Sequence, residues 1–169
     1  MRTDMRIKAI FLLAIFLVTL VSGCGNTQAG DVDYGKALDF ELQDINGNRL
    51  RLSDRSGRII ILNFFATWCP PCRMEMPDFN QIAKEYKNDV EVIAVNIAGE
   101  NLSIVRDFVD ANKLEFPVAI DNNTANKLYG PINAIPVTVI IDKDFNIVRR
   151  YIGMRTKEVF VRDIEELSR

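Results

Sequence analysis

An apolar run that leads directly into two cysteines constrains this chain more than any other feature. Residues 59–65 are Ile-Ile-Ile-Leu-Asn-Phe-Phe and are apolar apart from Asn63. A continuous run of this length, rich in β-branched and aromatic residues, is typical of a strand covered on both faces, as in a parallel sheet. The sequence therefore predicts a buried central strand over residues 59–65.

A helix is predicted to begin directly after this strand. Pro70 and Pro71 fall in its first turn, where backbone N–H groups have no partner within the helix and a fixed φ is compatible with it. Cys69 then lies at or next to the N-cap, where free N–H groups and the positive end of the helix dipole stabilise a thiolate. Cys72 lies on the same face one turn along, close enough to form a small disulfide ring. Cys69 is therefore expected to attack, and Cys72 to resolve.

A zinc site and a structural disulfide are two other interpretations of this cysteine pair. Zinc needs two further Cys or His ligands, and the chain contains no histidine and only one other cysteine, Cys24. A structural disulfide that closes so short a ring would constrain the unfolded chain little. The pair is therefore interpreted as a redox centre that needs neither a metal nor another cofactor.

The Trp-Cys-Pro-Pro-Cys segment at residues 68–72, after an apolar strand and before Pro77, resembles the thioredoxin superfamily. More narrowly, it is similar to the membrane-tethered TlpA/ResA-like thiol-disulfide oxidoreductases. The resemblance covers residues 36–168 and implies a thioredoxin-like α/β fold, in which helices flank a central mixed sheet. It also implies an N-terminal β-hairpin and a central helix–strand insert.

The remaining elements are predicted from apolar periodicity and capping residues. Residues 40–42 and 50–52 flank an Asn-Gly-Asn turn, which predicts a hairpin added to the central sheet. Further strands are predicted over residues 90–97, 116–120, 137–141 and 147–152, with a short helix over 123–129.

Three longer helices complete the predicted domain. The helix that follows the cysteines should extend to about Lys87, with a kink at Pro77. Asn101 and Thr156 are expected to cap the other two. The inner face of the helix over residues 101–112 is predicted to contain Ile104, Val105, Phe108 and Val109.

The N-terminus has the features of a secretory signal. Arg2, Arg6 and Lys8 precede an uncharged run over residues 9–21. This run is short for a membrane span, which needs about 20 apolar residues. The Val-Ser-Gly-Cys sequence that ends at Cys24 resembles a bacterial lipobox, which implies cleavage before Cys24 and lipid attachment to its sulfur.

We therefore expect a lipoprotein signal peptide over residues 1–23, a flexible tether over 24–35 and the folded domain over 36–169. An uncleaved signal anchor, or cleavage that leaves Cys24 as a free thiol, is the alternative. Each version places the domain outside the cytoplasm. The 21 basic and 23 acidic residues include no basic tract, so nothing indicates nucleic-acid binding.

Pro136 precedes an apolar strand. The base rate and the family resemblance predict different isomers, trans and cis, for the peptide bond between Ile135 and Pro136. Only about 5% of X–Pro bonds are cis, so the sequence alone predicts a trans bond. The segment from Ile135 to Asp142 resembles the cis-proline segment of the family, however. By that match Pro136 is cis and lies against the cysteine pair, and Ile135 offers backbone groups to an extended substrate.

Glu75 and Asn63 are the candidate proton-handling positions. Glu75 lies three residues after Cys72, and a solvated surface carboxylate is the ordinary interpretation. The resemblance implies instead a glutamate near the thiols, which would raise their pKa or move a proton during resolution.

Thioredoxins proper have a buried aspartate, the proton acceptor for the resolving thiol, where this chain has Asn63. An amide cannot take that role, so the base would be Glu75, water or the substrate thiolate, and Asn63 is expected to be a hydrogen-bonded interior amide.

Residues beside the cysteines are expected to form the docking surface. Trp68 should cover the disulfide and, with Pro70 and Pro71, contact the substrate, with core packing as the alternative for Trp68. Thr67 is expected to hydrogen-bond the local backbone rather than to take part in catalysis.

The sequence thus predicts a lipid-anchored, extracytoplasmic thiol-disulfide oxidoreductase. The resemblance implies a reductant recharged by a membrane electron donor of the CcdA/DsbD type, with the haem-attachment cysteines of apocytochrome c as clients. A role in envelope or spore-coat maturation, or a non-enzymatic lipoprotein binding module, is the alternative. Peroxiredoxins share the fold but need Pro-x-x-x-Thr-x-x-Cys, and Ala66 replaces that threonine here.

Overall fold

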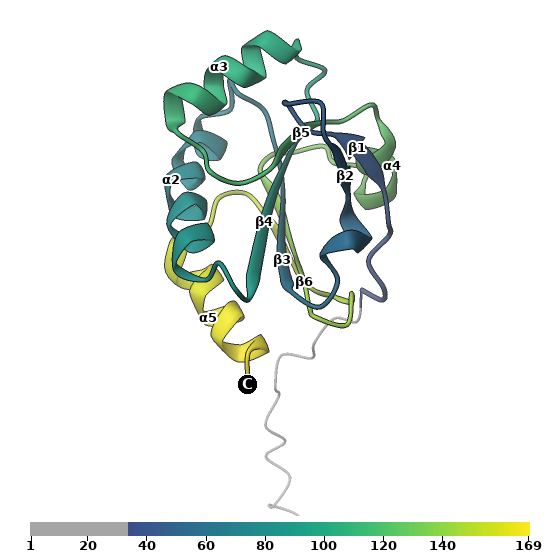
Figure 1. Ribbon diagram of the computed structural model, residues 1–169, viewed down its shortest axis with the longest axis vertical. Helices are drawn as coiled ribbons and strands as arrows, with labels where there is room; N and C mark the ends of the chain where they lie inside the picture. Colours follow the sequence, from purple (N-terminus) through teal and green to yellow (C-terminus); the bar gives the residue numbers. More distant parts are fainter. Residues whose placement is uncertain (1–33) are drawn as a thin grey trace, which may run out of the picture. The chain divides into compact units, whose positions relative to one another are not determined.

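The computed structural model describes residues 34–169, which contain a five-stranded sheet. Helices lie on both faces of this sheet (Figure 1). The strand order is β5-β4-β3-β6-β7. The strands are β3 (Ile59–Phe65), β4 (Val90–Asn96), β5 (Val118–Ile120), β6 (Val137–Ile141) and β7 (Ile147–Ile152). The central strand β3 is parallel to β4 and antiparallel to β6, so the sheet is mixed, as predicted.

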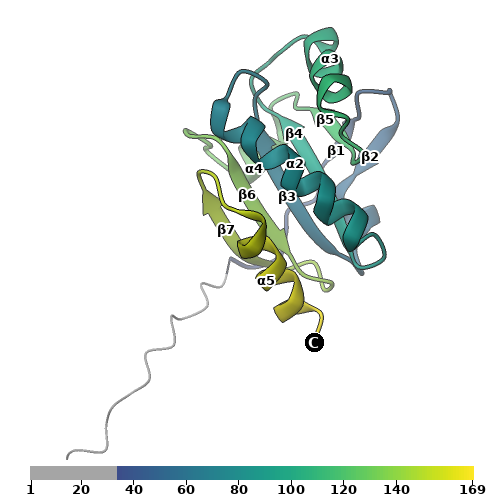
Figure 2. The ribbon, with the colours of Figure 1, turned by 90° about the vertical axis from the view of Figure 1, so that its left-hand side faces the viewer.

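The helices divide between the two faces of the sheet (Figures 1 and 2). One face is covered by α2 (Pro70–Glu85), α3 (Leu102–Asn112) and α5 (Lys157–Leu167). The other is covered by α4 (Thr124–Tyr129) and by a hairpin of β1 (Glu41–Gln43) and β2 (Arg49–Arg51), followed by the 3₁₀ helix η1 (Leu52–Arg55). α3 and β5 together form the predicted helix–strand insert.

Each face of the sheet has its own apolar core, and β3 contributes to both. Ile59, Ile61 and Phe65 pack toward α2, α3 and α5, while Ile60 and the next even-numbered apolar residues pack toward the hairpin and α4. All seven residues of β3 are buried. Full burial of one such side chain stabilises a fold by about 1.5–3 kcal/mol, so this strand anchors both layers.

The hairpin forms as predicted, but the prediction that it extends the central sheet is wrong. β1 and β2 make a separate two-stranded antiparallel sheet. Leu42 and Leu50 pair side by side and are both buried, whereas their neighbours along each strand are exposed. This single apolar face packs into the apolar core on its side of the sheet, and the chain after β1 meets the edge strand β5 through a bridge between Asp44 and Ala119 and a hydrogen bond from the Ile45 N–H to the Val118 carbonyl oxygen.

Several predicted boundaries and packing positions also need correction. α2 ends at Glu85 rather than Lys87 and contains Pro77. Asn101 and Thr156 are at the N-cap positions of α3 and α5, but neither side chain makes a capping hydrogen bond. Ile104 is 47% exposed, because the inner face of α3 is formed by the i, i+3, i+4 set Val105, Phe108 and Val109.

The predicted signal peptide, Cys24 and most of the predicted tether lie outside the described residues. Within residues 34–169, no helix combines the length and the apolar character that crossing a membrane requires.

Candidate active site

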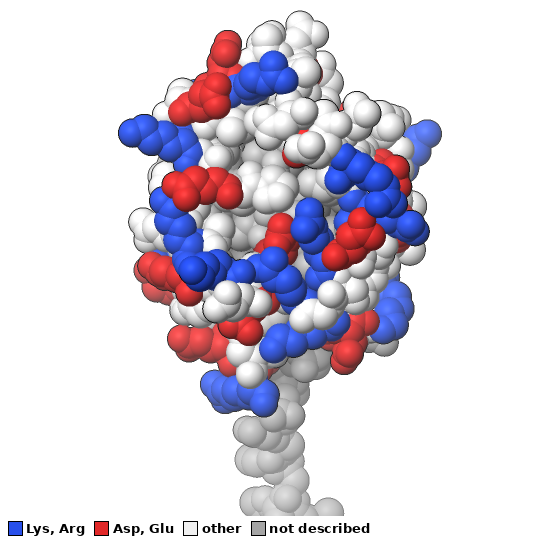
Figure 3. Space-filling model, in the orientation of Figure 1, with Lys and Arg blue, Asp and Glu red and all other residues white. Residues whose placement is uncertain are grey.

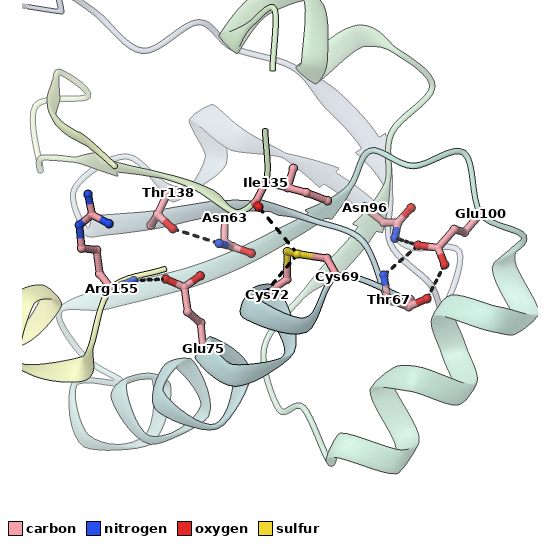
Figure 4. The surroundings of a disulfide bond; sticks show 10 residues. All are labelled: Asn63, Thr67, Cys69, Cys72, Glu75, Asn96, Glu100, Ile135, Thr138 and Arg155. Carbon is pink, nitrogen blue, oxygen red and sulfur yellow. Dashed lines mark hydrogen bonds between the residues drawn. A yellow bond between two sulfur atoms is a disulfide. The ribbon is translucent and has the colours of Figure 1, made fainter. Parts of the chain in front are cut away.

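The two cysteines lie at the N-terminus of α2, shortly after β3 ends, and they form a disulfide (Figure 4). Cys69 is the N-cap of α2, with extended backbone, and Pro70 and Pro71 occupy the first turn. The backbone N–H of Cys72 points at Cys69 Sγ across 3.3 Å. Cys69 is 3% exposed and Cys72 is not exposed at all, so only Cys69 offers surface to a reagent.

The loop before β6 lies against this disulfide. The Ile135–Pro136 peptide bond is cis, as the resemblance predicted. The carbonyl oxygen of Ile135 lies 3.8 Å from Cys69 Sγ. Cys69 and Ile135 are 66 positions apart in the chain but lie side by side in the fold. The backbone of Ile135 is therefore next to any group that binds to the Cys69 sulfur.

Glu75 is buried, so the interpretation as a solvated carboxylate is wrong. Its side chain points from α2 toward the sheet (Figure 4), and the residue is 1% exposed. Oε1 accepts a 2.7 Å hydrogen bond from the backbone N–H of Arg155, while Oε2 is buried and accepts none within the described residues. Burial is the main influence on this carboxyl and raises its pKa from 4.5 to about 7, against the opposing effect of Arg155. Glu75 can therefore exchange a proton near neutral pH.

Asn63 is the interior amide that was expected. It is fully buried on β3, and its Nδ2 donates a 3.0 Å hydrogen bond to Thr138 Oγ1 on the neighbouring strand β6. Its Oδ1 is buried and accepts no hydrogen bond within residues 34–169. The amide lies between Thr138 and the disulfide (Figure 4).

The loop between β7 and α5 supports both the proline and the carboxylate, and sequence reasoning missed it. The N–H of Gly153 donates to the carbonyl oxygen of Pro136 at 2.8 Å, and the N–H of Arg155 donates to Glu75. Gly153 has a φ of +79°, which glycine adopts without a steric penalty. No motif marks these residues, because they act through their backbone.

Glu100 holds the segment just before the first cysteine and was also missed. Its carboxylate accepts hydrogen bonds from the backbone N–H and the hydroxyl of Thr67, and a 2.6 Å bond from Asn96 Nδ2. The expectation that Thr67 bonds the local backbone is therefore wrong. The parallel pairing of β3 with β4 could have indicated this contact. The carboxyl ends of two parallel strands lie side by side, so Thr67, which follows β3, lies near Glu100, which follows β4.

The surface beside the disulfide combines apolar and polar side chains around an exposed tryptophan. Trp68 is 65% exposed, so core packing of this side chain is excluded. It lines a shallow groove with Pro70, Arg73, Met74 and Asn112. Away from this groove, basic and acidic side chains are interspersed on the face in Figure 3. Among the described residues, no group of three or more His, Cys, Asp or Glu side chains is placed to hold a metal ion.

Comparison with known proteins identifies the family. Residues 35–150 match the AhpC/TSA family. The chain belongs to this family. It is 40% identical over 126 residues to the thiol-disulfide oxidoreductase ResA of Bacillus cereus, covering 73% of this chain and 71% of that protein. It is 35% identical over 158 residues to the thioredoxin-like protein YneN of Bacillus subtilis, covering 88% of this chain and 92% of YneN.

Solved structures agree with this placement within the AhpC/TSA family. A Chlorobium tepidum protein assigned as the thiol:disulfide interchange protein DsbE has a TM-score of 0.73 at 31% identity, over 80% of this chain and 96% of that one. The pneumococcal exposed lipoprotein thioredoxin Etrx1 from Streptococcus pneumoniae has a TM-score of 0.69 at 29% identity, over 77% of this chain and 100% of that one. This AhpC/TSA member is therefore a thioredoxin-fold thiol-disulfide oxidoreductase of the ResA type, with protein disulfides as its substrates.

Proposed function

We propose that the protein is a lipid-anchored reductant that works outside the cytoplasm on the haem-attachment cysteines of apocytochrome c. The observation that carries the proposal is the asymmetry of the cysteine pair: Cys69 is at the N-cap, has the Ile135 backbone beside it and is 3% exposed, while Cys72 is fully buried. The 40% identity to a ResA protein supports a reducing role. The likeness to a protein named as an exposed lipoprotein supports lipid attachment at Cys24.

In the first step, the Cys69 thiolate attacks one sulfur of the client disulfide. The Cys69–client bond forms, the client S–S bond breaks, and the other client sulfur leaves as a thiolate. The N–H of Cys72 and the end of the α2 dipole stabilise the Cys69 thiolate before attack. Trp68, Pro70 and Pro71 contact the client, and an extended client strand lies along the Ile135 backbone beside cis-Pro136.

In the second step, Cys72 resolves the mixed disulfide. Its thiol loses a proton, its sulfur attacks Cys69 Sγ, and the second client thiolate leaves. The enzyme dithiol is oxidised by two electrons and the client disulfide is reduced by two. Glu75 accepts the proton, because it is buried one turn along α2 and Asn63 has no basic atom for the task. A membrane electron donor of the CcdA/DsbD type then reduces the Cys69–Cys72 disulfide.

The first test is the reduction potential of the full-length protein in detergent, equilibrated against defined thiol–disulfide buffers. A value near that of thioredoxin, about −270 mV, supports a reductant. A value near about −120 mV makes the protein an oxidant and removes the proposed role in cytochrome maturation.

The second test concerns the client. A peptide containing an oxidised Cys-x-x-Cys-His segment should be reduced by the wild-type protein and not by a folded Cys69→Ala variant. Equal reduction of unrelated envelope proteins, with no preference for this peptide, favours the alternative role in envelope or spore-coat maturation. Full biological function of Cys69→Ala would instead indicate a non-enzymatic binding module.

The lipid anchor is tested separately. Mass spectrometry of the N-terminal peptide should show cleavage before Cys24 and a lipid on its sulfur. A Cys24→Ala variant should no longer partition with membranes, whereas retention of the variant on membranes would indicate an uncleaved signal anchor.

A further inference from the structure

The loop over residues 130–135, which connects α4 to cis-Pro136, brings its last residue to the disulfide. The carbonyl oxygen of Ile135 lies 3.8 Å from Cys69 Sγ (Figure 4). Within residues 34–169, Ile132 has the only backbone N–H of this loop that donates a hydrogen bond. Its acceptor is Oδ1 of Asn126, on α4, at 3.4 Å. One side-chain amide thus supplies the polar support for the backbone of an otherwise unbonded loop.

Gly130 begins this loop at a point where its backbone touches α4. A Cβ at this position would lie 2.3 Å from the carbonyl oxygen of Asn126 and 2.7 Å from the nitrogen of Ile132. Its φ is −113°, which other residues adopt, so the requirement for glycine comes from space and not from backbone conformation. Any other residue here would push the loop away from α4.

The loop crosses from one apolar core to the other. Ile132 packs against the core on the side of the hairpin, and Ile135 packs against the core on the side of α2. The N–H of Gly153 donates to the carbonyl oxygen of Pro136 at 2.8 Å, which fixes the end of the loop. The start of the loop therefore relies on its contacts with α4.

The helix α4 is itself tied to the central sheet. The carboxylate of Asp121 accepts hydrogen bonds from the N–H groups of Ala125 and Asn126, at 2.9 and 3.0 Å. The N–H of Asp121 donates to the carbonyl oxygen of Asn96, at the end of β4, at 2.8 Å. A loop that is held against α4 is thus also held relative to the sheet and to Cys69.

We propose that Asn126 and Gly130 are positioning residues, which hold the loop so that the Ile135 backbone is ready to bind a client. This inference rests on the proposed function, in which an extended client strand lies along that backbone. A loop that is ordered before binding loses little conformational entropy when the client binds, so client affinity is higher. Both residues act through the loop and not on the sulfur atoms, so the thiol chemistry should not depend on them.

The test is a single turnover of the full-length protein, reduced beforehand and held in detergent. The client is an oxidised peptide with a Cys-x-x-Cys-His segment, mixed at increasing concentrations. Trp68 is the only tryptophan of the sequence and directly precedes Cys69, so its fluorescence follows oxidation of the cysteines. The half-saturating peptide concentration measures client affinity, and the limiting rate constant measures the thiol chemistry.

Asn126→Leu keeps the approximate size of the side chain but offers no acceptor to the Ile132 N–H. The half-saturating peptide concentration should rise about tenfold, with the limiting rate constant unchanged. Gly130→Ala should weaken client affinity at least as much, because its Cβ displaces the loop. Exchange of the Ile132 amide hydrogen with solvent, followed by nuclear magnetic resonance, should become about tenfold faster in both variants.

Two matched variants and a second substrate serve as controls. Asn126→Asp keeps an oxygen acceptor and should match the wild type in client affinity and in Ile132 exchange. Lys127→Leu places the same leucine at the next, exposed position of α4 and should also match it. A small aliphatic disulfide has no peptide backbone to lie along Ile135, so all these proteins should reduce it equally.

Faster Ile132 exchange in Asn126→Leu with unchanged client affinity would overturn the inference and leave the proposed function standing. Equal loss of affinity in Asn126→Asp would also overturn it, because the acceptor would then not be the cause. The same holds if reduction of the small disulfide slows as much as reduction of the peptide. Failure of the wild type to reduce the peptide at all would overturn the proposed function, and this inference with it.

Discussion

The backbone N–H of Cys72 points at Cys69 Sγ across 3.3 Å, so the fully buried cysteine donates to a partner that is 3% exposed. This hydrogen bond stabilises the Cys69 thiolate over the thiol once the disulfide is reduced. The same geometry keeps the Cys72 sulfur away from solvent. The two thiols therefore differ in chemistry although they are only three residues apart.

A Cys72→Ser variant should accumulate a covalent complex with its client. Cys69 can still attack, but no thiol remains to resolve the mixed disulfide, so turnover should fall by at least about 10³-fold. Mass spectrometry of the trapped complex measures the outcome. Cys69→Ser is the control and should form no complex, and a complex formed through Cys72 in that control would reverse the assigned roles.

The stability of the oxidised protein should fall as pH rises from about 4.5 to about 7 because of Glu75. The folded protein binds this proton more tightly than the unfolded chain does, since burial raises the pKa of Glu75 from 4.5 to about 7. Stability from this group is thus full below pH 4.5 and is lost by pH 7, which amounts to at most about 3 kcal/mol. Denaturant unfolding at pH 5 and pH 8 measures the difference.

Glu75→Gln is the control for this pH dependence. The amide has no proton to lose, so the difference in free energy of unfolding between pH 5 and pH 8 should become small. An undiminished difference in this variant would show that another group causes it.

Glu100→Ala should lower the free energy of unfolding by about 2–3 kcal/mol, because it removes an acceptor from the Thr67 N–H and from Asn96. Although burial, the largest influence, raises the pKa of Glu100, the hydrogen bonds from Thr67 and Asn96 bring it below 4.5 overall. This stabilisation is therefore present above pH 4.5 and is lost as pH falls through the lower folded pKa.

Thr67→Val is the matched control for Glu100. It removes only the hydroxyl bond and should cost about 1 kcal/mol. An equal loss in the two variants would contradict the view that Glu100 also holds the backbone of Thr67 and the side chain of Asn96.

Trp68→Ala should weaken client binding without unfolding the protein. The side chain is 65% exposed, so the free energy of unfolding should change by less than about 0.5 kcal/mol. The KM for a protein client should rise about tenfold, equivalent to about 1.4 kcal/mol of lost contact. Reduction of a small aliphatic disulfide is the control, and an equal effect there would show that Trp68 acts on the thiols rather than on docking.

The elements nearest the disulfide could be predicted from the sequence almost to the residue. β3 spans the predicted Ile59–Phe65, and Cys69 is the N-cap of α2. Both predictions rest on local rules, namely the composition of a doubly covered strand and the place of proline in a first helical turn. The cis bond at Pro136 followed from resemblance alone, because the base rate favours trans.

The surroundings of the disulfide could not be predicted in this way. The buried carboxyl of Glu75 finds its hydrogen-bond donor at Arg155, which is 80 positions away in the chain. Thr67 likewise finds its partner Glu100 at a distance of 33 positions. Such contacts can be predicted only when the sheet order and the paths of the loops are known, because no local sequence pattern encodes them. The predicted position of the hairpin was wrong for a related reason. Alternation of apolar and polar residues specifies that a strand has one apolar face, but not what that face packs against.

The loop between β7 and α5 has a consequence for how a client and a proton interact. Two backbone amides of this loop, at Gly153 and Arg155, bond the cis-proline segment and Glu75 respectively. If a bound client displaces the loop and changes the proton affinity of Glu75 by some factor, thermodynamic reciprocity requires protonation of Glu75 to change the client affinity by the same factor. Dithiol and disulfide forms, which differ in the charge near Glu75, would then bind one client with different strength.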